Sequence, residues 1–120
     1  MNSLRLPAGL LGSLLLLAGT SCSLCHEPEP ENLPPSVYQV SYAQTQCADK
    51  WGQARTPQQL ETVATAYLAQ QGITLTSPKA TQAAPASVCN ACACPTGVVL
   101  VGEVVPSQLA AIQALGFTKL

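Results

Sequence analysis

The chain of 120 residues has few charged side chains, one histidine and one methionine. Charged residues make up 9% of it, and its formal net charge is −1 at pH 7. It has no basic stripe to neutralise phosphates, so nucleic-acid binding has no electrostatic basis. It also has no glycine-rich phosphate loop, since Gly97 and Gly102 stand alone.

The single histidine, His26, lies near the N-terminus, and its position excludes two kinds of catalytic centre from the rest of the chain. Neither a Ser-His-Asp triad nor a Cys-His pair can form there. Asp49 and Glu61 are carboxylates to consider as an acid–base pair. However, Asp49 fits a turn, and Glu61 fits the first turn of a helix, where an acid complements the helix dipole. We therefore expect a protein that is not an enzyme.

The longest apolar run, residues 10–18, is shorter than the roughly 20 residues that a membrane-spanning helix needs. Arg5 precedes the run and is the only charged side chain before Glu27. A short apolar run behind a basic residue at the extreme N-terminus is typical of a signal peptide. We predict a signal peptide over residues 1–21.

Residues 17–22, LAGTSC, resemble the lipobox of bacterial lipoproteins. In a lipobox, small or aliphatic residues precede a cysteine that is diacylated on sulfur and becomes the mature N-terminus. Gly19 stands where the lipobox usually has leucine. The resemblance implies that acylated Cys22 anchors the protein in the lipid bilayer of the cell envelope. The anchor would lie in the outer face of the cytoplasmic membrane or in the outer membrane.

Cys22 also begins a C-x-x-C-H string that ends at His26, the pattern used to attach a c-type haem. A lipidated Cys22 has no thiol left for a thioether bond to haem. A second axial ligand is also lacking, because the only methionine is Met1, which leaves with the signal peptide. We therefore expect no haem, and the role of Cys25 stays open.

Residues 22–35 are rich in proline and glutamate. Too little apolar surface is available there to offset the entropy of ordering, and closely spaced prolines with like charges favour an extended chain. At about 3.1 Å per residue, such a chain reaches roughly 40 Å. We predict a tether that holds a domain away from the bilayer.

Residues 36–120 are long enough for one small domain, and their patterns alternate between strand and helix. Residues 37–42 alternate as a half-buried strand does. Thr56, as an N-cap before a proline, begins a helix that Gly72 ends. The apolar residues of this helix recur at helical spacing: Leu60, Val63, Ala64, Tyr67 and Leu68.

Further elements follow in the order strand 73–76, loop 77–87, central strand 98–105, a short helix capped by Ser107 and closed by Gly116, and a possible last strand at 117–120. This order is that of an α+β fold, the ferredoxin-like split βαβ sandwich. A right-handed crossover then makes the first and second strands parallel, with the third between them.

The topology also brings four cysteines to one end of the sheet. Cys47 lies just past the first strand, and Cys89, Cys92 and Cys94 lie just before the third. Residues 46–52 and 89–97, QCADKWG and CNACACPTG, are similar to a recurring pattern in small exported bacterial proteins of uncharacterised function. The resemblance covers most of residues 37–120 and implies no mechanism.

Three kinds of chemistry suit these four cysteines. In an oxidising compartment, an even number of cysteines in a small domain usually forms disulfides. Alternatively, Cys47, Cys89, Cys92 and Cys94 are a candidate thiolate site for Zn²⁺ or Cu⁺. Thiol–disulfide catalysis is the third. The first cysteine of a catalytic C-x-x-C motif normally lies at a helix N-terminus, however, whereas Cys89 precedes a strand.

If disulfides form, ring strain restricts their pairing. A bond between Cys92 and Cys94 would close a very small ring, so we predict that Cys47 pairs with Cys92 or Cys94 and that Cys89 takes the other. Trp51, close to Cys47 in sequence, is expected to be a packing residue. Two functions stay open: an envelope lipoprotein that presents a surface to another envelope component, and a periplasmic protein that binds a soft metal.

Overall fold

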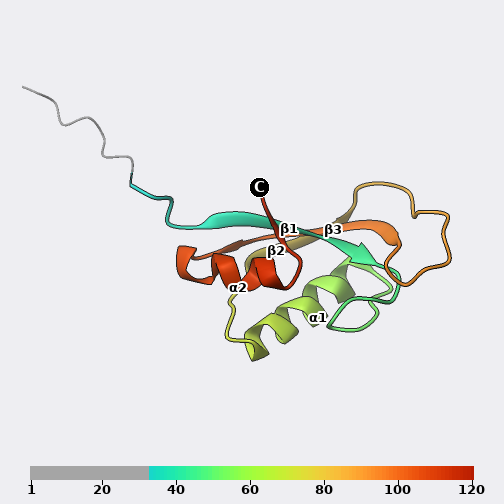
Figure 1. Ribbon diagram of the computed structural model, residues 1–120, viewed down its shortest axis with the longest axis horizontal. Coiled ribbons are helices and arrows are strands. Elements are labelled where there is room, and N and C mark those ends of the chain that lie inside the picture. The colour runs from blue at the N-terminus through green and yellow to red at the C-terminus, as the bar shows by residue number, and fades with distance from the viewer. Residues whose placement is uncertain (1–32) are drawn as a thin grey trace, which may run out of the picture. The chain divides into compact units, whose positions relative to one another are not determined.

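The computed structural model describes residues 33–120. The predicted signal peptide (1–21), the lipidated Cys22 and the tether up to residue 32 lie outside the described residues. Tether residues 33–35 are exposed and have no regular secondary structure. The remainder forms an α+β domain with a four-stranded sheet and two helices (Figure 1). Within residues 33–120, neither helix has the length and hydrophobicity to cross a membrane.

The sheet is antiparallel throughout, with the strand order β2-β3-β1-β4. Its strands are β1 (Tyr38–Thr45), β2 (Thr76–Gln82), β3 (Pro95–Val104) and β4 (Thr118–Lys119). Because β3 pairs antiparallel with both β1 and β2, the first two strands are parallel to each other with the third between them. This part of the topology was predicted from the crossover rule and is confirmed.

Helix α1 (Pro57–Gln70) begins and ends where its local signals indicate. The Thr56 side chain accepts a hydrogen bond from the Gln59 N–H (3.1 Å), and the Gln59 side chain reaches back to the Arg55 N–H (2.8 Å). At the other end, Gly72 adopts a left-handed φ of 75°, and the Ile73 N–H donates to the Leu68 carbonyl (2.9 Å). This last bond satisfies a carbonyl that the final helical turn leaves open.

The second helix begins differently from the prediction. A 3₁₀ helix, η1 (Pro106–Gln108), leads directly into α2 (Leu109–Ala114), so Ser107 lies inside the 3₁₀ turn and makes no capping hydrogen bond. Pro106 takes the first position of this turn, where its missing N–H costs nothing. Gly116 closes α2 with a φ of 100°, as expected.

Both helices lie on the same side of the sheet (Figure 1). The core between the two layers is formed by alternate residues of β1 and β3 and by one face of each helix. Its largest fully buried side chains are Val40, Leu60, Leu68, Leu100, Val104 and Ile112. In the described part of the chain, the other face of the sheet has no helical layer (Figure 1). The residues of β3 that point to that face, such as Val99 and Val101, are therefore only half-buried.

The second strand was misplaced by sequence reasoning. Residues 73–76 alternate, but Ile73 and Leu75 fill the core from a connection without regular secondary structure. The strand itself runs from Thr76 to Gln82, almost entirely within the predicted loop. Ser77 has a φ of 49°, and the pairing with β3 is irregular between Thr76 and Lys79. Pro78 fits this irregular stretch of an edge strand, where a missing N–H is tolerated.

Candidate functional site

The four cysteines of the domain lie together where β1 ends and β3 begins. Beyond the last residue of β1, the Gln46 N–H donates to the Cys94 carbonyl (2.9 Å), and the Cys47 N–H donates to the Cys92 carbonyl (3.1 Å). These backbone bonds continue the pairing of β1 past the sheet. They place Cys47 beside Cys92, one of the three cysteines that the predicted topology brought to this end of the sheet.

The structure pairs Cys47 with Cys92 and Cys89 with Cys94, which is one of the two predicted arrangements. The Cα atoms are 4.5 Å apart in the first pair and 6.2 Å apart in the second. Within the second pair, a turn closed by the Cys94 N–H and the Ala91 carbonyl (3.0 Å) brings the two residues together. Cys94 is buried, whereas the other three cysteines are exposed.

This bonding limits what the cluster can do. Cys89 and Cys92, the two ends of the C-x-x-C string, belong to different disulfides, so the string is not a redox pair of its own. No helix begins at Cys89, so no helix dipole is available to lower a thiol pKa there. Among residues 33–120, no group of three or more His, Cys, Asp or Glu side chains has the arrangement of a metal site.

Asp49 closes the loop that carries Cys47. Its Oδ1 atom accepts hydrogen bonds from the Tyr42 hydroxyl (2.8 Å), the Thr45 N–H (3.0 Å) and the Thr45 hydroxyl (2.6 Å). Oδ2 has no hydrogen-bond partner among the described residues. Burial raises the pKa of the Tyr42 phenol well above its usual range, and the hydrogen bond and negative charge of Asp49 raise it further. Asp49 therefore fixes the end of β1.

Glu61 takes part in a separate contact. Glu61 was predicted in the first turn of the helix, but α1 begins at Pro57 and has no acidic residue in its first turn, so Glu61 lies one turn further along. Its Oε1 atom accepts a hydrogen bond from the Ala80 N–H of β2 (2.7 Å). Asp49 instead accepts hydrogen bonds from Tyr42 and Thr45 at the end of β1. The two carboxylates thus have different partners on different strands. Sequence reasoning found both residues but missed both networks, because their partners are set by tertiary structure.

Trp51 lies in an aromatic cluster that packs against the core, which confirms the packing role predicted for it. Its ring centroid is 4.6 Å from that of Tyr42, 6.0 Å from that of Phe117 and 6.1 Å from that of Tyr67. Edge-on and tilted contacts of this kind are favourable beyond the area that they bury. The cluster ties the cysteine-bearing loop to α1 and to the C-terminal residues.

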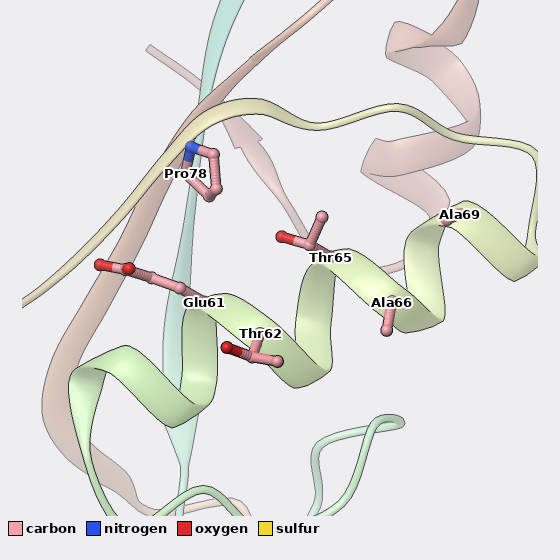
Figure 2. Close-up of a pocket in the computed structure, with 6 residues that line it drawn as sticks. All are labelled: Glu61, Thr62, Thr65, Ala66, Ala69 and Pro78. Carbon is pink, nitrogen blue, oxygen red and sulfur yellow. The ribbon is translucent and has the colours of Figure 1, made fainter.

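A hollow of about 480 Å³ lies between α1 and β2 (Figure 2). It was not predicted, although the spacing of small residues along the helix was a signal for it. Its lining is mostly small or apolar and contains one charged side chain, and the Thr65 hydroxyl has no hydrogen-bond partner among the described residues. The lining residues are Glu61, Thr62, Thr65, Ala66, Ala69 and Pro78.

Neither location assembles a nucleophile with a base. The cysteine cluster joins two loops covalently, and the hollow offers a single carboxylate already bonded to backbone. Compared with known proteins, the chain matches no protein-family model, no curated protein and no solved structure.

Proposed function

We propose that the chain is a lipid-anchored protein of the bacterial cell envelope that works without catalysis, by contacting another envelope component. In this proposal, residues 1–21 are removed as a signal peptide and Cys22 carries the acyl chains. Residues 22–35 are the tether, and the domain of residues 36–120 makes the contact.

The observation that carries the proposal is that all four cysteines of the domain are bonded to one another. Structural disulfides form and persist in oxidising compartments and are rare in the cytosol. The pairing therefore supports export of the domain. Cys22 and Cys25 are left for other chemistry, and the resemblance of residues 17–22 to a lipobox assigns the lipid to Cys22.

The fold that we assign is the ferredoxin-like split βαβ sandwich. The element order β-α-β-β-α-β and the strand order β2-β3-β1-β4 support this assignment. An antiparallel sheet of this kind often has one face packed on a core and the other face in solvent. That second face is available for a contact with another molecule.

We assign the contact to the sheet face opposite the helices, here called the open face. Strand register places Ala43, Val99 and Thr81 in one row across it, and Ser41, Val101 and Lys79 in the next. Only Lys79 and Glu103 are charged among the positions on this face. A weakly charged surface of small and branched side chains suits a protein partner, because little charge has to be desolvated on binding.

Acylation is tested by metabolic labelling of the full chain with a fatty-acid analogue. We expect Cys22→Ala to lose the label and membrane association, and we expect Cys25→Ala, the matched control, to retain both. Persistent labelling of Cys22→Ala would refute the anchor. A haem absorbance band in the wild-type protein would instead favour attachment through the C-x-x-C-H string.

The contact is tested separately by photo-crosslinking in intact cells. A photoreactive amino acid replaces Thr81 on the open face or, as the control, Gln58 on the exposed side of α1. We expect Thr81 to capture one discrete envelope protein that Gln58 does not capture. Equal capture from both positions, or none from Thr81, would contradict the assignment of the open face.

A further inference from the structure

The edge strand β2 is the longest stretch of sheet in the described domain with no strand paired along one of its sides. It has seven residues and pairs only with β3, whereas the other edge strand, β4, has two residues. A free edge of this length is a template for pairing with a strand from another molecule. Long edges usually carry a device that prevents such pairing.

The free side of β2 has fewer donors than its length suggests. Pro78 has no N–H to offer to a further strand. The Ala80 N–H donates to Oε1 of Glu61 (2.7 Å), so it points toward α1 and away from the ladder with β3. Two successive outward positions of β2 therefore have no N–H free for a further strand: Pro78 lacks one, and that of Ala80 is bonded to Glu61 of α1.

The Glu61 oxygen stands where the carbonyl oxygen of an added strand would have to stand. In Figure 2 the Glu61 side chain leaves α1 and extends toward the strand that carries Pro78. Glu61 is only half-buried, yet its acceptor is used within the molecule. An added strand would have to break a hydrogen bond to a charged group, one of the stronger kinds in proteins.

We propose that Glu61 and Pro78 guard the β2 edge against pairing with a second copy of this chain. The guard occupies the Ala80 donor and leaves no donor at position 78, so two copies cannot form a regular ladder through their β2 strands. Exposed Lys79 adds repulsion in any antiparallel register that sets the two copies of this cation opposite each other. The guard does not depend on the lipid anchor or on the open face.

The test compares Glu61→Ala with Glu61→Gln in the full chain, solubilised in detergent. Glutamine keeps an acceptor oxygen for Ala80, and alanine removes it. For Glu61→Ala we expect hydrogen exchange at the Ala80 amide to become about tenfold faster at low protein concentration. We also expect dimers or larger species by sedimentation as the concentration rises, with the Ala80 amide protected again in them.

Glu61→Gln should keep slow exchange at Ala80 and the oligomeric state of the wild-type protein. Glu103→Gln, which removes an acidic charge away from the edge, should behave in the same way. Pro78→Ala gives a second route that leaves α1 intact, and it should also increase association by restoring a donor. The proposal is overturned if Glu61→Ala and Pro78→Ala both keep the wild-type oligomeric state, or if the wild-type protein already pairs through β2.

Discussion

Deleting each disulfide separately should destabilise the domain by different amounts, because the two bonds close loops of very different length. Cys47 and Cys92 are 45 residues apart, whereas Cys89 and Cys94 are 5 apart. In the chain-entropy model, the first bond restricts the unfolded chain by about 4 kcal/mol and the second by about 2 kcal/mol. The double variant Cys47→Ala/Cys92→Ala should therefore lose more stability than Cys89→Ala/Cys94→Ala.

The burial of Cys94 reduces this difference in stability between the two double variants. Cys94 is 5% exposed, so replacing it with alanine also removes a buried sulfur, at a further cost of about 1 kcal/mol. Cys47 and Cys92 are exposed, so their replacement removes little besides the cross-link. The free energies of unfolding of the two double variants should therefore differ by about 1 kcal/mol. A loss of about 4 kcal/mol is still large beside the roughly 5–15 kcal/mol that stabilises most domains.

The assay is urea unfolding followed by the fluorescence of Trp51, the only tryptophan, which lies in the aromatic cluster. Peptide mapping of each variant checks that the other disulfide is intact. Equal midpoints for the two double variants, or a larger loss without the Cys89–Cys94 bond, would refute the loop-length reasoning. Mapping of the oxidised wild-type protein should show both bonds, whereas free Cys47 together with bound zinc or copper would favour the metal site.

The parts of the fold that sequence predicted well are those fixed by local chemistry. The bounds of helix α1 were predicted from Thr56, the proline after it and Gly72. These residues form or allow capping hydrogen bonds within one turn of the helix ends, so their effect does not depend on the rest of the fold. The approach of Cys47 to Cys89, Cys92 and Cys94 followed from handedness, since a right-handed crossover leaves few arrangements for the strands. Ring strain then reduced the pairing to two possibilities.

The parts that sequence predicted poorly depend on distant neighbours. The polar stretch of β2 forms a strand because its backbone pairs with β3. An edge strand needs a partner on one side only. The residues just before it, which alternate, fill the core without pairing: Leu75 packs over Gly102, where a Cβ atom would collide with it. The Glu61–Ala80 contact spans two elements and has no sequence signature.

Two further predictions concern residues close to the cysteines in sequence. Gly52 and Gly97 both have a φ of 85°, but a Cβ atom at Gly52 meets open space, whereas one at Gly97 collides with the Ala84 carbonyl. Gly97→Ala should therefore lower the free energy of unfolding by about 1–3 kcal/mol more than Gly52→Ala in urea unfolding, and equal losses would contradict the described packing. Tyr42→Phe should change how stability depends on alkaline pH. Because folding raises the phenol pKa above its unfolded value near 10, the stabilisation from the protonated phenol is complete below about pH 10 and is lost as pH rises toward the folded-state value. Urea unfolding between pH 8 and about pH 11 should show a steeper loss of stability in the wild-type protein than in Tyr42→Phe, and parallel curves would mean that Asp49 and burial do not hold this proton.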